Sequence, residues 1–221
     1  MAGRPALDRD TDSRDLSALA ALAGRPHVVG PLMNTYNEAT LAFLARNGAG
    51  TVCLPPELPL ASIHSMAIAG HALGVEIEVF AFGRMPLAIS ARCYHARLQG
   101  LTRDSCRYVC SQDADGLDVD TLDGQPFLAI NGLQTLSHAW CSYAGDVARL
   151  MEAGVGALRL SPQTCDMVAA ARIFRDVLDG RLAAGEADER LGRLAPHAGF
   201  ANGYLDGLPG IATRSVGSQK L

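Results

Sequence analysis

The sequence predicts an α/β fold built from TIM-barrel-like parallel βα units, and two observations support this prediction. Short apolar segments typical of buried strands begin near His27, Thr51, Glu76 and Val155. Amphipathic segments with helical periodicity lie between or after these strands. Because strands that alternate with helices pair in parallel through right-handed crossovers, the pattern favours a barrel or a doubly wound sheet.

Four strands of this kind are too few for a complete barrel. An eight-stranded barrel typically needs about 250 residues, whereas this chain has 221. We therefore expect a partial barrel that is incomplete on its N-terminal side. The expected strands are HVVGP, TVCLP, EIEVFAFG and VGALRLSP, and the expected helices are NEATLAFLARNGAG, LPLASIHSMAIAGHALG, SYAGDVARLMEAG and CDMVAAARIFRDVLDG.

The domain prediction is one partial barrel over residues 26–211, interrupted by two insertions. After Gly83 the strand-helix alternation stops, and a cysteine-rich loop is expected over residues 84–115. Residues 116–131 are expected to form a β-hairpin about Asp123-Gly124, a dipeptide that tolerates the positive φ angles of a tight turn. Residues 1–25 are predicted to be an atypical or poorly ordered leader, and residues 212–221 a flexible tail.

Composition favours an ordinary globular protein. The chain is 48% hydrophobic and 19% charged, with a formal net charge of -4, so there is no electrostatic reason to expect a nucleic-acid partner. The longest apolar runs are far shorter than the ~20 residues of a membrane span, and the chain does not open with the pattern of a signal peptide. We predict a cytoplasmic protein without a membrane span, in which thiols stay reduced.

Three of the six cysteines lie within ARCYHARLQGLTRDSCRYVC: Cys93, Cys106 and Cys110, spaced C-x12-C-x3-C. Clustered thiols in a reducing compartment more often bind metal than form disulfides. Sulfur donors suit zinc or an iron–sulfur cluster, and the spacing discriminates only weakly between them: structural zinc sites favour two close cysteine pairs, whereas here only Cys106 and Cys110 form one, and cluster proteins use more irregular spacings. Arginine neighbours favour the thiolate form. By contrast, Cys53 and Cys165 are interpreted as small apolar residues of the core.

Several longer segments resemble the UbiV family, a branch of the collagenase-like peptidase (U32-type) superfamily. The resemblance rests on FAFGRMPLAISARCYHARLQGLTRDSCRYVC, which contains the cysteines, with NGLQTLS, ALRLSPQ, PLMNTYNEATLAFLARNGA and NGYLDGLPGI. It covers about residues 26–211. The long cysteine pattern is specific to that family, whereas each short motif alone is not.

This resemblance implies a TIM-barrel-like fold and a 4Fe-4S cluster, with Cys93, Cys106 and Cys110 as three of its ligands. The fourth ligand of UbiV-like chains lies in the N-terminal part of the barrel, and the first 25 residues here contain no cysteine. The chain therefore looks N-terminally shortened, and Cys141, Cys53 or an exogenous thiol are the candidate stand-ins, with Cys141 placed in a loop before a helix.

The function implied by the resemblance is oxygen-independent (anaerobic) hydroxylation in ubiquinone biosynthesis. The expected partner is a UbiU-like paralogue in a heterodimer, and the apolar precursor suggests a lipid-carrier protein as a further partner. Two alternatives remain open: a collagenase-like hydrolase, and a non-catalytic binding partner stabilised by a metal such as zinc. The six histidines show no metal-ligand spacing, and His95 beside Cys93 is a weak candidate for a general base.

Further polar residues have two possible roles each. Arg84 and Arg92 flank the cysteine loop, where they either contact a ligand or form ion pairs. Glu57 either faces the barrel mouth or caps a helix. Asn131, Gln134 and Thr135 lie where a strand is expected to end and either face the active site or cap a turn.

Overall fold

The computed structural model describes residues 12–13 and 15–214, and these residues form a mixed α/β protein. Where the sequence predicts one barrel domain, the chain divides into two compact units. Among the described residues, unit 1 comprises residues 12–13, 15–80, 148–159 and 204–208, and unit 2 comprises residues 81–147, 160–203 and 209–214.

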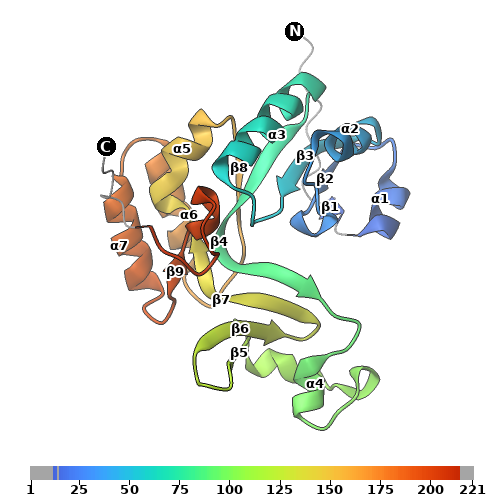
Figure 1. The fold of residues 1–221 in the computed structure, drawn as a ribbon, viewed down its shortest axis with the longest axis vertical. Coiled ribbons are helices and arrows are strands. Elements are labelled where there is room, and N and C mark those ends of the chain that lie inside the picture. The colour runs from blue at the N-terminus through green and yellow to red at the C-terminus, as the bar shows by residue number, and fades with distance from the viewer. Residues whose placement is uncertain (1–11, 14, 215–221) are drawn as a thin grey trace. The chain divides into compact units, whose positions relative to one another are not determined.

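Unit 1 contains the parallel βα units that the sequence predicts. Its strands occur in the order β1, β2, β3, β4, all paired in parallel, and β8 also pairs with β4. Figure 1 shows α1 and α2 close to β1–β3. The bounds are β1 Asp12–Ser13, α1 Leu16–Leu22, β2 His27–Val29, η1 Pro31–Met33, α2 Glu38–Arg46, β3 Ala49–Leu54, α3 Leu60–Leu73, β4 from Glu76, α5 Val147–Glu152, β8 Ala157–Leu160 and η5 Gly203–Asp206.

The helices of unit 1 begin and end at residues whose chemistry explains the boundary. Asn37 accepts a hydrogen bond from the Thr40 amide and caps α2, and Asp15 caps α1 through the Ser17 and Ala18 amides. Such caps satisfy amides that have no partner inside the helix. Gly74, with φ of 70°, ends α3 in the left-handed conformation that glycine adopts without strain.

Part of the predicted leader is structured. Within residues 12–25, β1 pairs with β2 and α1 follows it, whereas residues 1–11 and 14 lie outside the described residues. A two-residue strand has no periodicity to detect, which is why the sequence did not predict it. Part of the predicted tail is also held to the rest of the chain. The Arg214 amide donates a hydrogen bond to Asn202 Oδ1 at 2.7 Å. Residues 215–221 lie outside the described part.

Unit 2 is built on an antiparallel sheet that the sequence predicted only in part. Strand β4 (Glu76–Ile89) runs on past Gly83, so the cysteine-rich loop begins at Ser90 and not at residue 84. The expected hairpin is present, with strands β5 and β6, and β6 pairs with a further strand, β7, that in turn pairs with β4 and β9. The bounds are α4 Tyr94–Leu98, η2 Arg103–Ser105, η3 Val109–Gln112, β5 Leu117–Asp120, β6 Pro126–Asn131, β7 Gln134–Ser142, η4 Ala144–Asp146, α6 Met167–Leu178, α7 Ala184–Leu194 and β9 Phe200–Ala201.

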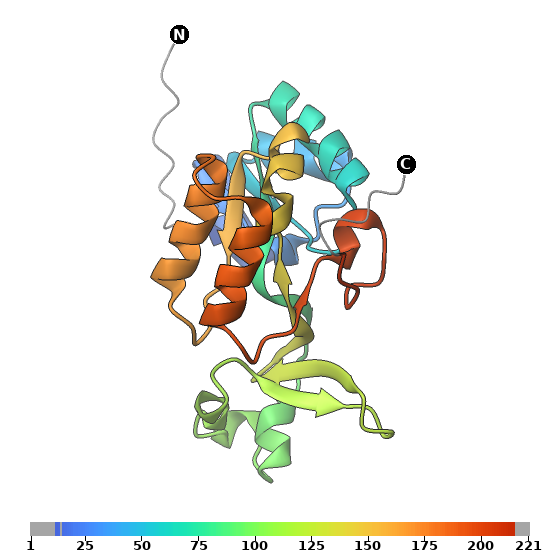
Figure 2. The ribbon, with the colours of Figure 1, turned by 90° about the vertical axis from the view of Figure 1, so that its left-hand side faces the viewer.

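The core of unit 2 is aromatic. Phe82 is fully buried, and its ring centroid lies 5.8 Å from that of Trp140, 6.0 Å from Phe174 and 6.2 Å from Phe200. These rings come from β4, β7, α6 and β9, so one cluster holds four elements together. Figure 2 shows α6 and α7 packed side by side beside this sheet. In the part of the chain that the structure describes, no helix combines the length and apolar character needed to cross a bilayer.

Replacing Phe82 with alanine should destabilise unit 2 by about 3–5 kcal/mol, because a large buried ring leaves a cavity among three other aromatic rings. Urea unfolding followed by the fluorescence of Trp140, the sole tryptophan of the chain, measures this loss. Phe127→Ala is the matched control, since Phe127 is 60% exposed. Equal losses in the two variants would contradict the role assigned to the aromatic cluster.

Candidate metal centre

The cysteine segment, residues 90–116, connects β4 to β5 and carries the three predicted site residues. It contains one short helix, α4, and two 3-10 turns, η2 and η3. Both views of the ribbon show it lying against the β5–β6 hairpin (Figures 1 and 2). Cys93 precedes α4, Cys106 ends η2 and Cys110 lies in η3.

The Cys93 thiol lies at the start of α4 and is almost fully buried. Its Sγ atom accepts a hydrogen bond from the Ala96 amide at 3.4 Å, which caps the helix. The same Sγ donates to the carbonyl oxygen of Gly132 at 3.4 Å. Gly132 belongs to the turn between β6 and β7, so the thiol links the cysteine segment to the hairpin.

The Cys110 sulfur lies at the same turn. A Cβ atom added to Gly132 would be 3.7 Å from Cys110 Sγ, and the φ angle of Gly132 is +60°. The structure therefore brings two of the three predicted sulfurs, those of Cys93 and Cys110, to one glycine. Cys106 is half-buried and lies four residues before Cys110 along the chain.

The chain between Cys106 and Cys110 is strained. Arg107 and Tyr108 have φ angles of 51° and 54°, so two consecutive non-glycine residues adopt the left-handed conformation. Such residues cost on the order of 1–3 kcal/mol each and persist only where their surroundings hold them. Strain of this kind concentrates at ligand sites, and here it lies inside the C-x3-C spacing.

A contact between a buried histidine and a half-buried carboxylate joins the two ends of the segment. His95 in α4 is 2% exposed, and its Nε2 atom lies 2.9 Å from Oδ2 of Asp113, directly after η3. The hairpin holds the same region, because Asn131 Nδ2 donates to the carbonyl oxygens of Asp113 and Ala114, each at 3.1 Å. Sequence reasoning did not predict this pair, because its two members lie eighteen positions apart in the chain.

The segment and hairpin have almost no apolar core. Among residues 90–131, the buried side chains are those of Cys93, His95, Ala96 and Ala129. Two alanines bury little surface, at about 25 cal/mol per Å². Small units with so little core are commonly held by a disulfide or a metal. All six cysteines of this chain are free thiols, so no disulfide supplies that link.

The donor chemistry of the segment fits an iron–sulfur cluster, which cysteine thiolates hold. The described residues nevertheless contain no group of three or more His, Cys, Asp or Glu side chains that is placed to hold a metal ion. Binding therefore requires the sulfurs to move closer together than they lie here. The three-cysteine site and its 4Fe-4S cluster remain predictions.

The chain matches a known protein family. Residues 20–215 match the family model described as peptidase family U32. The chain belongs to this family. No solved structure matches the chain. Membership in peptidase family U32 agrees with the superfamily part of the resemblance seen in the sequence, and it leaves the UbiV branch as a proposal.

The other three cysteines of this U32 chain lie outside the segment. Cys141, predicted in a loop, is instead fully buried in β7. It lies seven positions along an extended strand from Gln134 at the hairpin turn, roughly 23 Å at 3.3 Å per residue, so it is not a suitable stand-in for the fourth ligand. Cys53 is buried in β3 as expected of a core residue. Burial raises the pKa of both thiols, which disfavours the thiolate.

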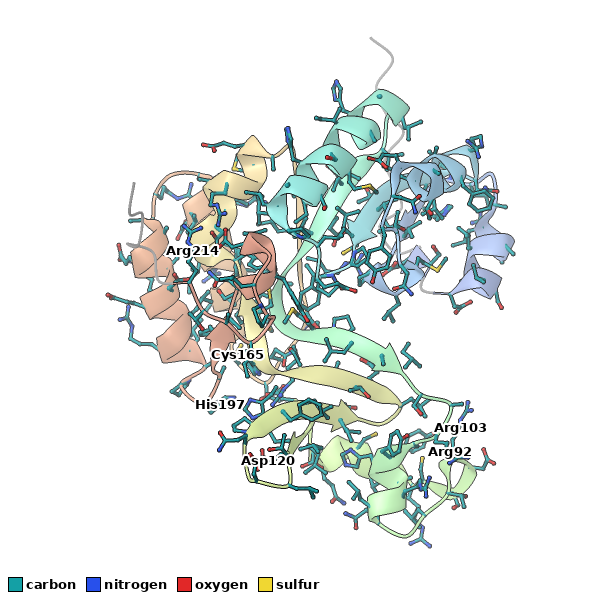
Figure 3. The ribbon with its side chains drawn as sticks, in the orientation of Figure 1. Arg92, Arg103, Asp120, Cys165, His197 and Arg214 are labelled. Carbon is teal, nitrogen blue, oxygen red and sulfur yellow. The ribbon has the colours of Figure 1, made fainter. Side chains whose placement is uncertain are left out.

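The arginines near the segment have different roles. Arg84, buried in β4, donates from Nη1 to the carbonyl oxygens of Ser137 and His138 at 3.0 and 2.8 Å, and from Nη2 to Asp118 at 2.7 Å. These hydrogen bonds hold β7 and the β5–β6 hairpin to β4, so they explain the role of Arg84. Arg92 and Arg103 are exposed and reach outward from the cysteine segment (Figure 3).

Unit 1 contains a polar pocket that sequence reasoning missed. A pocket of about 210 Å³ is lined by Val28, Thr51, Glu76, Glu78, Ala157, Leu158 and Arg159. Arg159 donates from Nε to Glu78 at 2.6 Å and from Nη1 to Asp12 at 2.9 Å. The alternation EIE in β4 is the signal that places Glu76 and Glu78 on one face. Both Glu78 and Asp12 form ion pairs with Arg159, and these ion pairs hold β1, β4 and β8 together.

Tyr36 and Glu57 meet on the loops that follow β2 and β3. The Tyr36 hydroxyl donates a hydrogen bond to Glu57 Oε1. Of the two roles left open for Glu57, helix capping is not observed, because the N-cap of α3 is Pro59 and no side chain caps it. Desolvation, then the hydrogen bond and the negative charge of Glu57, raise the pKa of Tyr36 to about 12.

Replacing Glu57 with glutamine should lower the pKa of Tyr36 from about 12 towards the ordinary tyrosine value of about 10. Because the folded state holds this proton more tightly than the unfolded state, the contribution to stability is present below pH 10 and is lost as the pH rises through 12. Ultraviolet titration against Tyr36→Phe isolates this one hydroxyl. Glu38→Gln is the control, and a pKa that does not change in E57Q would rule out the coupling.

Replacing Asn131 with alanine should loosen the C-terminal end of the cysteine segment. The variant loses two hydrogen bonds to backbone carbonyls, worth about 1–3 kcal/mol locally. Hydrogen–deuterium exchange measured on peptides covering residues 103–116 should become about tenfold faster or more. Gln134→Ala, an exposed neighbour in β7, serves as the control. Unchanged exchange in N131A would show that Asn131 does not hold the segment.

Proposed function

We propose that this U32 chain is an iron–sulfur protein of the UbiV type, with Cys93, Cys106 and Cys110 as cluster ligands. The observation that carries the proposal is the sparse core of residues 90–131, in which a buried thiol and a buried histidine replace the usual apolar side chains. The placement of Cys93 and Cys110 at Gly132 supports it, as does the strained turn at Arg107 and Tyr108.

The chemistry of the residues indicates how each would act. The Ala96 amide, which donates to Cys93 Sγ, stabilises negative charge on that sulfur, as amides do around cluster sulfurs. The left-handed turn at Arg107 and Tyr108 sets the distance between Cys106 and Cys110. Exposed Arg92 and Arg103 give the segment a positive surface. A bound 4Fe-4S cluster supplies one-electron transfer.

The biological role follows from the resemblance to UbiV. In this role the chain acts in oxygen-independent hydroxylation of a ubiquinone precursor, as a heterodimer with a UbiU-like paralogue. A polyprenyl precursor is too apolar to diffuse freely through water, so a lipid-carrier protein is a further proposed partner. The proposed location is the cytoplasm, where reduced thiols are available for ligation.

Anaerobic purification tests the cluster. The wild-type protein should be brown and contain iron and acid-labile sulfide, and Cys106→Ser should reduce the iron content by about tenfold or more. Cys165→Ser is the matched control, because Cys165 is a half-exposed thiol that Figure 3 shows well apart from the labelled Arg92 and Arg103 of the cysteine segment. A colourless wild-type protein loaded with zinc would instead favour a metal-stabilised binding partner.

Binding of the cluster should also order the cysteine segment. Because metal ligation contributes free energy to folding where a core is absent, amides of residues 90–131 should exchange more slowly in the loaded protein than in the metal-free protein. The aromatic core of unit 2 provides the internal reference, since its exchange should not change. Equal exchange in both forms, despite bound iron and sulfide, would place the cluster elsewhere in the chain.

A further inference from the structure

The solvent-facing side of α4 combines apolar and cationic side chains. Tyr94, Arg97 and Leu98 are spaced i, i+3 and i+4, so they lie on one face of the helix. Tyr94 is 45% exposed and Leu98 is 62% exposed, and Arg97 is also exposed. The opposite face, with His95 and Ala96, is buried. Large apolar side chains grouped in solvent with polar neighbours are typical of an interaction surface.

The turn after η2 presents a second group of the same kind. Tyr108 is 80% exposed and Arg107 beside it is also exposed, although both residues hold the left-handed conformation. Tyr108 is the N-cap of η3, and η3 lies against α4. The turn therefore adds one aromatic and one cationic side chain to the region around the exposed face of α4.

The same stretch of chain is strongly cationic. Its four arginines and one acidic residue, Asp104, give residues 92–108 a formal charge of +3, whereas the whole chain has a net charge of -4. All four arginines are exposed, and within the described part of the chain none forms an ion pair or a side-chain hydrogen bond. Figure 3 shows Arg92 and Arg103 directed outward. The α4 surface, defined as the exposed arginine, tyrosine and leucine side chains of residues 92–108, therefore carries charge that the described chain does not neutralise.

Size and chemistry distinguish between the possible anionic partners of the α4 surface. A stable protein interface needs about 20–30 residues on each side, whereas this surface offers seven side chains. Nucleic acids are held by phosphate contacts and by stacking on aromatic rings, which leaves an exposed leucine without a role. An anionic phospholipid surface uses all three kinds of side chain, because arginines contact the headgroups, tyrosines lie at the boundary between polar and apolar regions, and leucine enters the acyl region.

We propose that the α4 surface docks this protein peripherally on an anionic phospholipid bilayer. Tyr94, Leu98 and Tyr108 enter the interface, and the arginines contact lipid phosphate groups. The position within unit 2 supports docking, because both ribbon views show α4 at the end of this unit that lies away from α6 and α7 (Figures 1 and 2). The inference goes beyond the proposed function and does not require a bound cluster.

Sedimentation of the full chain with lipid vesicles tests the proposal. The anaerobically purified protein should bind phosphatidylcholine vesicles that contain phosphatidylglycerol, and binding should weaken about tenfold or more as salt shortens the Debye length from about 10 Å at 0.1 M to about 3 Å at 1 M. Arg97→Ala should weaken binding about fivefold, the usual contribution of one arginine near an anionic surface. Leu98→Asp should abolish binding. Arg172→Ala and Val168→Asp in α6 are the matched controls, because both residues are exposed and lie outside the α4 surface.

A tryptophan placed in the turn reports where the contact occurs. Trp140, the sole tryptophan of the chain, is fully buried. Tyr108→Trp therefore adds a second emission, whose maximum should shift to shorter wavelength when vesicles containing phosphatidylglycerol are added. Val168→Trp is the control and should show no shift. A Tyr108→Trp variant that sediments with vesicles without a shift would place the contact elsewhere and overturn the proposal.

Other outcomes overturn the proposal without any variant. The wild-type protein contradicts it by binding neither kind of vesicle, or by binding pure phosphatidylcholine vesicles equally well. Binding to single-stranded RNA in the absence of vesicle binding would assign the α4 surface to nucleic acid, and a dimer that dissociates in Arg97→Ala would assign it to a second copy of this chain. Iron and sulfide are measured on the same preparation, so failure of docking is distinguished from failure of the proposed cluster.

Discussion

The scarcity of buried apolar surface in residues 90–131 is the constraint on which the candidate centre depends. The fully buried side chains of this segment are those of two alanines, a cysteine and a histidine, so full burial of apolar side chains contributes little to ordering its backbone. Its described conformation relies on polar contacts: the thiol of Cys93 on Gly132, the pair of His95 and Asp113, and the amide of Asn131. Each contact joins residues that are distant in the sequence. A bound metal would join distant residues in the same manner.

Strand β4 explains how such a segment arises in a βα protein. Its first residues pair in parallel with β3, and from Phe82 onward it pairs antiparallel with β7. The change replaces a helical crossover by a hairpin connection, and the cysteine segment and the β5–β6 hairpin occupy that connection. Register shifts on both sides of Pro86 interrupt the antiparallel pairing further along β4, since proline has no amide hydrogen to donate to a neighbouring strand.

The sequence predicted what depends on local periodicity and missed what depends on pairing. Strands at His27, Thr51 and Glu76 and the Asp123-Gly124 hairpin are visible because apolar runs and turn residues are local signals. Strand β7 mixes polar and aromatic residues, so only its neighbours make it a strand. The same limit holds at the site: the spacing identified three cysteines, but the contact between His95 and Asp113 forms only when the chain folds back.

The family name points to peptide hydrolysis, and the geometry of the segment argues against a cysteine nucleophile there. A nucleophilic thiol needs a base within hydrogen-bond reach and access to the substrate. Cys93 is 8% exposed, and its Sγ atom contacts backbone groups of Gly132 and Ala96. The Nε2 atom of His95 contacts Asp113, and its Nδ1 has no hydrogen-bond partner among the described residues, so neither ring nitrogen is hydrogen-bonded to a cysteine thiol. A fold carries many chemistries, and buried donors without an accessible nucleophile are suited to ligation.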